Sequence, residues 1–279
     1  CSMPMTAPLA RSLGVLSVTQ LAQLGWTRDD RRAALASGRL VRVRTGWLAR
    51  TDAHVEVVAA VRSGGCVACT SALRLHGAWV PTHLVRGHVR RARRGDRRPS
   101  GCRPFGPTPA VASAIDDVET AFRCALRCGT DEDIVVLADS VLHLGLATLD
   151  ALERWSTHAP ARIRALLDRV DAAESGLESM VRLRLRSRRI RVRTQVRIGR
   201  RRVDLLVGDL LVIECDGAEH HAGWEAHEAD RERDRALTAA GYTVVGLTYR
   251  QIVEDWPAVE EHLLQLVRRG AHRASRGTR

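Results

Sequence analysis

Three carboxylates lie within or directly after two apolar, strand-like segments: Asp204, Glu214 and Asp216. Acidic side chains are uncommon in strands and costly to bury without a partner, so this placement indicates a chemical role. Residues two apart in a strand share a face, so Glu214 and Asp216 point the same way. Carboxylate oxygens are the ligands that hard divalent cations prefer. The sequence therefore predicts a site for Mg²⁺ or Mn²⁺.

The length of the loop between the two segments decides whether Asp204 joins the other carboxylates. A three-residue loop from Gly208 to Leu210 puts Asp204 opposite Glu214 on one face. A two-residue loop turns Asp204 to the other face, because a one-residue slip in pairing reverses every side chain. Only the first register gathers three carboxylates.

The acidic hairpin lies within a pattern of helices and strands that predicts a mixed α/β domain over residues 173–279. The expected order is a helix over 175–188, a strand over 192–196, hairpin strands over 202–207 and 211–216, a helix over 224–240, a strand over 243–248 and a helix over 257–269. Ser175 and Glu178 have the spacing of a capping box at the start of the first helix. Pro257 suits the first turn of the last helix, where proline is tolerated.

This order of elements, α-β-β-β-α-β-α with an acidic hairpin, resembles the restriction-endonuclease-like PD-(D/E)XK nuclease superfamily. More narrowly, residues 174–269 resemble domains related to very-short-patch-repair endonucleases, over about a third of the chain. The matching segments are Glu174-Ser-Gly-Leu-Glu178, Arg202-Val-Asp204-Leu-Leu-Val, Val212-Ile-Glu214-Cys-Asp216-Gly-x-x-His220-His221, Asp230-Arg-Glu-Arg-Asp234-Arg235 and Ala240-Gly-Tyr-Thr-Val-Val245. The resemblance implies a metal-dependent hydrolase of DNA, an endonuclease or nickase, with DNA repair as one setting.

The resemblance also implies roles for individual carboxylates. Asp204 corresponds to the metal-binding aspartate of the superfamily, and Glu214 corresponds to the acidic member of the (D/E)XK motif. Glu178 matches the acidic residue that completes the metal site in many members. The ion would neutralise phosphate charge, lower the pKa of bound water and orient the water for attack.

The chain departs from the superfamily at Asp216, which stands where the motif has its lysine. All 44 basic residues are arginine, so no lysine can position or activate the attacking water. His220 or His221 is the natural substitute, with His221 as general base or leaving-group acid. Asp216 is then either a further metal ligand or a turn residue at the end of a strand. Gln195 is a candidate for orienting water or phosphate.

The composition indicates an anionic partner. The chain has 279 residues, which suits two or three domains, and a formal net charge of +12. Arginine binds phosphate oxygens through two hydrogen bonds, and Arg202 and Arg235 are candidates for this contact. There is neither an apolar run of transmembrane length nor a secretory signal pattern, so a soluble, cytoplasmic protein without membrane contact is expected.

Residues 1–53 predict a winged-helix DNA-binding domain. Helices are expected over 17–24 and 28–37, and strands over 39–44 and 47–50. Thr27 and Asp30 have capping-box spacing, and Gly38 suits the end of the second helix. This start resembles abortive-infection antitoxin-like proteins over residues 12–80. The candidates for DNA contact are Arg28, Arg31, Arg32, Arg39, Arg42 and Arg44. The alternative is a winged helix that serves only packing or protein contacts.

Residues 54–172 predict a mixed middle domain with helices over 68–77, 111–127, 134–142 and 148–155. A basic strand and loop over 85–98 is either a nucleic-acid contact or a solvated face. The pairs Cys66-x-x-Cys69 and Cys124-x-x-x-Cys128 could form a four-thiolate zinc site. Their apolar neighbours favour small core residues instead.

Two other functions remain compatible with the sequence. One is a DNA-binding transcriptional regulator or antitoxin-like protein with an inactive nuclease fold, which the absent lysine favours. The other is a nuclease acting on RNA. If the chain cuts DNA, nicking versus double-strand cleavage depends on whether it forms a homodimer.

Overall fold

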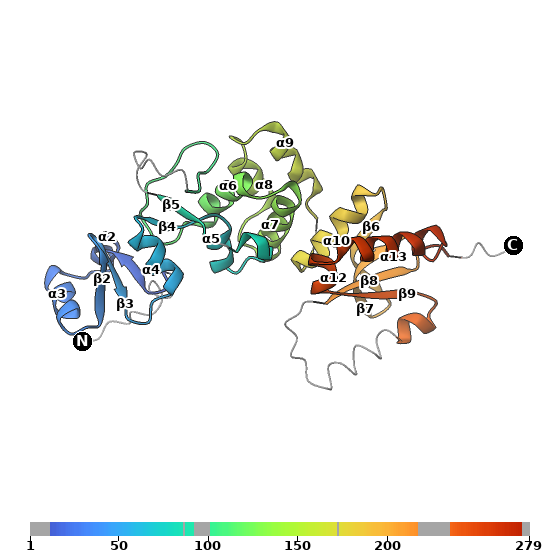
Figure 1. Cartoon of the computed structure of the whole chain (residues 1–279), viewed down its shortest axis with the longest axis horizontal. Coiled ribbons are helices and arrows are strands. Elements are labelled where there is room, and N and C mark those ends of the chain that lie inside the picture. Colours follow the sequence, from blue (N-terminus) through green and yellow to red (C-terminus); the bar gives the residue numbers. More distant parts are fainter. Residues whose placement is uncertain (1–11, 86, 92–100, 172, 217–234, 275–279) are drawn as a thin grey trace. The chain divides into compact units, whose positions relative to one another are not determined.

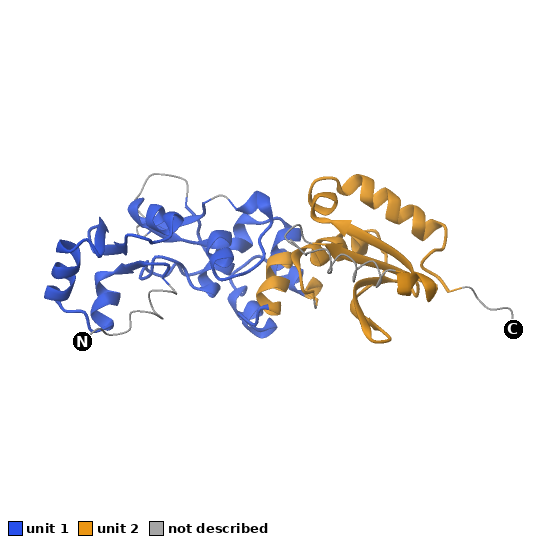
Figure 2. Cartoon of the chain, turned by 90° about the horizontal axis from the view of Figure 1, so that it is seen from below, with its two compact units in different colours: residues 1–134, 144–167 blue, residues 135–143, 168–279 orange. Residues whose placement is uncertain are grey.

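The computed structural model describes residues 12–85, 87–91, 101–171, 173–216 and 235–274. The chain forms two compact units, coloured separately in Figure 2. Unit 1 comprises residues 1–134 and 144–167, and unit 2 comprises residues 135–143 and 168–279. In the described parts of the chain, no helix has both the length and the apolar content needed to cross a membrane.

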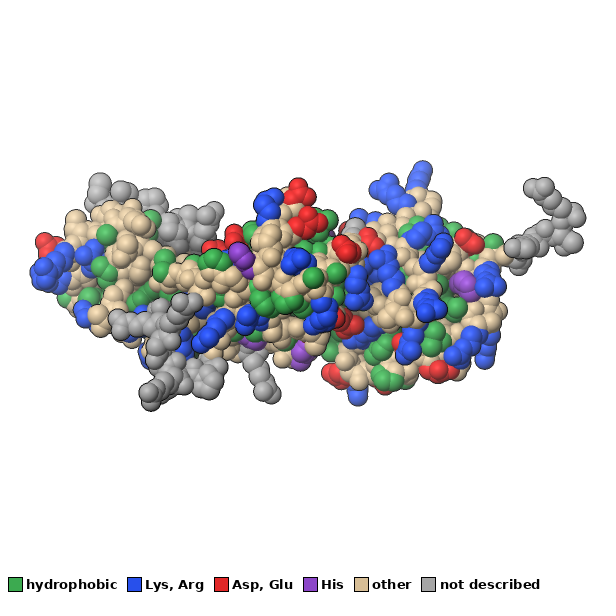
Figure 3. Space-filling model, turned by 90° about the horizontal axis from the view of Figure 1, so that it is seen from above, with side chains coloured by type: hydrophobic (Ala, Val, Ile, Leu, Met, Phe, Trp, Pro, Cys, Tyr) green, Lys and Arg blue, Asp and Glu red, His purple; other side chains and the backbone are tan. Residues whose placement is uncertain are grey.

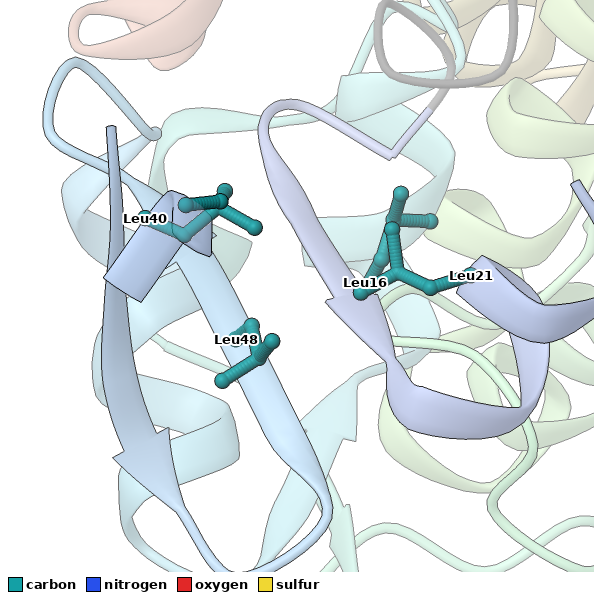
Figure 4. Close-up of a cluster of buried hydrophobic side chains, with 5 residues drawn as sticks. Leu16, Leu21, Leu40 and Leu48 are labelled. Atoms are coloured by element: carbon teal, nitrogen blue, oxygen red, sulfur yellow. The ribbon is translucent and has the colours of Figure 1, made fainter. Parts of the chain in front are cut away.

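Unit 1 begins with two helices and a three-stranded antiparallel sheet. Its elements are β1 (Val15–Ser17), α2 (Val18–Gln23), α3 (Arg28–Ala36), β2 (Leu40–Arg44) and β3 (Trp47–Arg50), with strand order β1-β3-β2 (Figure 1). The predicted capping box is present, since Thr27 accepts from the Asp30 backbone and Asp30 accepts from the Thr27 backbone. A leucine-rich core closes this part around Leu16, Leu21 and Leu48 (Figure 4).

The rest of unit 1 is mainly helical. Its elements are α4 (Val55–Arg62), β4 (Gly65–Val67), α5 (Cys69–Leu75), the 3-10 turn η1 (Thr82–Leu84), β5 (Val89–Arg91), α6 (Val118–Cys128), the first residues of α7 (Asp131–His143), α8 (Leu149–Trp155) and α9 (Ala161–Arg164). Strands β4 and β5 pair antiparallel. A 3-10 turn, η2 (Ala165–Arg169), follows α9.

The helix predicted over 111–127 begins only at Val118, so the first part of that prediction is wrong. Asp117 caps α6 by accepting from the Thr120 backbone. The preceding residues instead run beside β4, where the Val67 backbone bonds to Ala114 and Asp116. Long-range pairing with a strand therefore overrides the local helical pattern.

The basic segment over 85–98 is partly structural. Arg90 is only 3% exposed and donates two hydrogen bonds to the carboxylate of Asp116, at 2.8 and 2.6 Å. The Arg91 guanidinium donates to the Ser63 carbonyl. The remaining arginines of this segment, Arg86 and those between 93 and 98, lie outside the described residues. Arg90 is thus a buried partner of Asp116 and cannot contact nucleic acid.

Unit 2 is a four-stranded sheet with helices packed against it. Its elements are α10 (Gly176–Ser187), β6 (Val192–Ile198), β7 (Arg201–Val207), β8 (Leu211–Asp216), β9 (Thr243–Thr248), α12 (Tyr249–Val253) and α13 (Trp256–Arg268), and residues 235–239 are also helical. The strand order is β6-β7-β8-β9, with β9 parallel to β8 and the other neighbours antiparallel. Helix α10 contacts β6, β7 and β8. Leu237 packs with Val203, Leu206 and Val212 of the sheet.

The loop between β7 and β8 is the three-residue one. Val207 pairs with Leu211, so Gly208, Asp209 and Leu210 form the turn. Gly208 has φ +60°, and a Cβ at this position would lie 2.3 Å from the His272 carbonyl oxygen. That carbonyl accepts a 2.8 Å hydrogen bond from the Asp209 backbone. The glycine and this contact fix the register that brings Asp204 level with Glu214.

Candidate active site

Asp204 and Glu214 are neighbours across the β7–β8 hairpin. They occupy the next positions after the pair Leu205–Ile213. Glu214 Oε2 lies 3.4 Å from the Asp204 backbone nitrogen, and Asp204 Oδ2 accepts a 2.8 Å hydrogen bond from the Cys215 backbone. Glu214 is only 5% exposed. Burial of a carboxylate at this position requires compensation, which a bound cation would supply.

Two further side chains extend this pair across the sheet and to α10. Gln195 lies on β6 between residues that pair with Val203 and Leu205, so it is level with Asp204. Its φ is +52°, an unusual backbone conformation for a residue other than glycine. The Gln195 amide donates a 2.6 Å hydrogen bond to Glu178 Oε2. Gln195 therefore links the sheet to the acidic residue at the start of α10.

The capping box predicted at the start of α10 is only half formed. Ser175 accepts from the Glu178 backbone at 3.2 Å, as expected for an N-cap. The Glu178 carboxylate does not return to Ser175 but accepts from the Glu174 backbone and from Gln195. Tertiary contact with β6 thus redirects a side chain that local geometry assigns to the cap.

Gly246 of β9 and Asp216 at the end of β8 complete the site. Gly246 pairs with Glu214, and Asp216 pairs with Thr248. A Cβ added to Gly246 would lie 3.7 Å from Asp216 Oδ2, so the missing side chain of Gly246 faces the Asp216 carboxylate. Asp216 is exposed. No local pattern in the sequence marks Gly246, because its importance depends on the strand that lies beside it.

Two groups at the site, Glu178 and Cys215, have a raised pKa. Burial, together with the nearby Asp204 charge, raises the pKa of Glu178, which is only 3% exposed. Burial likewise raises the pKa of the Cys215 thiol, and the charges of Asp204 and Glu178 add to this effect. A cation beside these groups would lower the pKa of Glu178 and favour its charged form.

The donor set suits a hard divalent cation. Asp204, Glu214 and Glu178 would hold the ion through carboxylate oxygens, as the sequence predicts. Within the described residues, three acidic side chains do not approach to within 4.8 Å of one another. A site with one or two direct carboxylates and several waters matches this spacing, and Mg²⁺ is usually bound in that way.

The other predicted residues of this domain are two arginines, two histidines and two aspartates. Arg202 forms an ion pair with Glu174. His220 and His221 lie outside the described residues, as do Asp230 and Asp234. Arg235 is described and lies in the helical residues 235–239.

The six arginines predicted to contact DNA in residues 12–50 divide into two groups. Arg28, Arg32, Arg39 and Arg42 are exposed. Arg31 instead donates a 2.7 Å hydrogen bond to the Trp26 carbonyl and holds the turn before α3. The Arg44 guanidinium lies against Gly64, where an added Cβ would be 3.2 Å from its Nη1. Four of the six thus extend into solvent.

One comparison with known proteins gives a match. Residues 177–267, about a third of the chain, match the model of the restriction-endonuclease-like family REase_MTES_1575. The matched segment begins within α10 and ends within α13, so it contains the whole carboxylate site. Searches among curated proteins and among solved structures gave no match.

The raised pKa of Glu178 predicts a stability effect. Glu178→Gln should raise the melting temperature of metal-free protein at pH 8 by a few degrees, because it removes a buried charge and, with it, the repulsion with Asp204. A raised carboxyl pKa means that the stability contributed by the protonated form is lost as pH rises through that pKa. The gain should therefore vanish in acid, below the pKa of unfolded glutamate. Differential scanning fluorimetry with and without Mg²⁺ measures it.

Glu261→Gln is the matched control, because Glu261 is exposed on α13. It should leave the melting temperature unchanged at both pH values. Mg²⁺ should stabilise the wild type more than Glu178→Gln. If metal-free Glu178→Gln is no more stable than the wild type at pH 8, the buried Glu178 charge beside Asp204 does not destabilise the protein.

Proposed function

We propose that this chain is a divalent-metal-dependent DNA endonuclease or nickase. The observation that carries the proposal is the line of Gln195, Asp204, Glu214 and Gly246 across four neighbouring strands, with Glu178 hydrogen-bonded to its first member. This line lies in a segment that matches a restriction-endonuclease-like family. The reaction is phosphodiester hydrolysis, and the cofactor is Mg²⁺ or Mn²⁺.

The side chains of the carboxylate site would have different roles in this reaction. A bound divalent ion would neutralise phosphate charge and lower the pKa of a coordinated water. Asp204 and Glu214 would hold the ion, and Glu178 would add a third carboxylate beside them. Gln195 keeps Glu178 directed at the sheet through its 2.6 Å hydrogen bond. The absence of a side chain at Gly246 leaves room next to Glu214 for a phosphate or a water.

Proton transfer must proceed without lysine in this chain. Asp216 stands at the position of the motif lysine, and its exposed carboxylate faces Gly246. We assign His221 as general base or leaving-group acid, with His220 as its alternative. Imidazole is suited to both roles because its ordinary pKa is near neutrality.

The N-terminal residues would deliver the nuclease to DNA. The order β1-α2-α3-β2-β3, with its antiparallel sheet, is the arrangement expected of a winged helix. The second helix, α3, and the hairpin of β2 and β3 carry the exposed Arg28, Arg32 and Arg42. In that arrangement the helix enters the major groove and the hairpin contacts the backbone.

One experiment tests the catalytic proposal. Wild-type protein is incubated with supercoiled plasmid, single-stranded DNA or RNA, with Mg²⁺, Mn²⁺ or EDTA. We expect nicked or linear plasmid with either ion and intact plasmid with EDTA. Cleavage of RNA alone would overturn the DNA substrate, and cleavage that continues in EDTA would overturn the metal requirement.

The arginines on α3 and β2 carry a separate prediction. The triple substitution of Arg28, Arg32 and Arg42 to alanine should weaken binding to duplex DNA. It should also reduce the slope of log affinity against log salt by about 2 to 3, since each phosphate contact contributes about 0.9. Fluorescence anisotropy across a salt series measures both quantities.

Arg31→Ala is the matched control on the same helix, because its guanidinium is bonded to the Trp26 carbonyl. It should lower thermal stability while leaving the salt slope nearly unchanged. An unchanged salt slope in the triple variant would show that these arginines of α3 and β2 do not contact DNA phosphates. Figure 3 shows that unit 2 also carries many arginines on one face, and those would then be the next candidates.

The absence of lysine favours a second candidate function, a DNA-binding regulator with an inactive nuclease fold. The same plasmid assay separates the two. Duplex binding without cleavage in Mg²⁺ and in Mn²⁺ would support the regulator. Cleavage that requires the carboxylates would support the enzyme.

A further inference from the structure

Four ligand-type side chains meet in unit 1, far in sequence from the carboxylate site. The sulfur atoms of Cys69, Cys102 and Cys128 and a ring nitrogen of His88 all lie within 4.8 Å of one another. Among the described residues, no other group of three or more cysteine, histidine or acidic side chains is so close together. The function proposed above uses none of the four.

Two of the four ligands lie at helix ends, and the other two lie in segments next to strand β5. Cys69 is the first residue of α5, and Cys128 is the last residue of α6, which packs against α5. His88 directly precedes β5; its backbone nitrogen donates to Ser71 Oγ at 3.0 Å, and its carbonyl accepts from Ala68 at 2.8 Å. The Cys102 backbone donates to Val89 at 2.9 Å.

The spacing of these atoms fits a tetrahedral zinc ion. Zinc–sulfur and zinc–nitrogen bonds of about 2.3 and 2.0 Å place tetrahedral ligands roughly 3.5 to 3.8 Å apart. His88 Nδ1 lies 3.3 Å from Cys102 Sγ, and the remaining separations are at most 4.8 Å. A small contraction of the cluster would complete the site. Three thiolates and one imidazole are a donor set typical of structural zinc.

The other described cysteines of unit 1, Cys66 and Cys124, do not belong to the cluster. Cys66 and Cys124 are fully buried in the apolar core, and burial raises the pKa of both thiols. Cys66 Sγ lies 3.3 Å from the Asp116 carboxylate and is not a member of the cluster. Each close cysteine pair in the sequence thus contributes one member to the core and one to the cluster. Such division is not expected if all the cysteines are merely small core residues.

We propose that Cys69, His88, Cys102 and Cys128 bind one structural Zn²⁺ ion. The site has four protein ligands, so it leaves no open position for catalysis. It joins the start of α5, the residue before β5, the segment after that strand and the end of α6. These segments are separated by tens of residues, and the ion would fix their approach.

The test measures zinc in the full-length protein. The chain is produced in zinc-supplemented medium, purified under reducing conditions and exchanged into metal-free buffer. Elemental mass spectrometry then measures the zinc content per chain. We expect about one zinc per chain. Replacement by Co²⁺ should give the intense visible absorption of tetrahedral cobalt and a thiolate-to-cobalt charge-transfer band.

Cys128→Ser should lose zinc, with affinity for the ion reduced at least about 100-fold in competition with a chromophoric chelator. Cys124→Ser is the matched control, one turn earlier on the same helix, and should keep the zinc. Wild type without zinc, with iron in its place, or with a disulfide between cluster cysteines under reducing conditions would overturn the proposal. So would equal zinc retention in both variants. None of these measurements depends on nuclease activity.

Discussion

Glu214→Gln is expected to reduce plasmid cleavage by about 10³-fold at saturating Mg²⁺. Removal of a single group that stabilises transition-state charge typically costs 10²- to 10³-fold, and loss of a metal ligand lies at the upper end. Glu214 is buried and lies next to the Asp204 backbone, so a neutral amide fits the space but cannot supply the charge. Initial rates of nicking on supercoiled plasmid measure the loss.

Asp209→Asn is the matched control for this prediction. Asp209 lies on the same hairpin, in the turn, and is exposed. Its substitution should leave the cleavage rate within about twofold, because an exposed turn carboxylate lies outside the site. Duplex DNA binding should remain in both variants. Cleavage by Glu214→Gln at the wild-type rate would show that Glu214 does not hold the catalytic ion.

Arg182→Met is expected to destabilise unit 2 by about 3 to 5 kcal/mol, the usual result of removing one partner of a buried ion pair. Arg182 and Asp139 are 0% and 1% exposed as side chains, and they form an ion pair. The Arg182 guanidinium also donates to the Arg169 carbonyl. Methionine fills similar volume but leaves the Asp139 charge buried without its cation. Urea denaturation measures the change in the free energy of unfolding.

The double variant Asp139→Asn and Arg182→Met separates charge from packing. The Asp171 backbone donates to Asp139 Oδ1 and Ser179 donates to Asp139 Oδ2. The single amide oxygen of asparagine can keep the bond from the Asp171 backbone, while the Ser179 hydroxyl turns to its Ser175 carbonyl partner and accepts from the amide nitrogen. We therefore expect the double variant to recover much of the lost stability. Asp131→Asn, which breaks the exposed pair with Arg162, should cost less than about 1 kcal/mol. A double variant no more stable than Arg182→Met would show that charge is not the cause.

The carboxylate site could be predicted in large part because its determinants are local. Alternation along the strands places Asp204 and Glu214 in the hairpin, and the glycine in the turn favours the observed three-residue loop. The capping box at Thr27 was predicted for the same reason, since its two partners are three residues apart. The short helix α12 was not predicted, although Thr248 and Gln251 have the spacing of a capping box and form one at its start.

The acidic hairpin, its turn and the starts of helices α3 and α10 follow from residues within one or two turns of the chain, so local patterns predict them. Tertiary packing determines which side chains meet across long separations, and it also moves the start of α6 to Val118. It directed Glu178 to Gln195, buried Arg90 against Asp116 and divided the cysteine pairs between core and cluster. The packing of the whole unit determines which distant segments approach one another. The spacing of residues along the chain does not predict this packing.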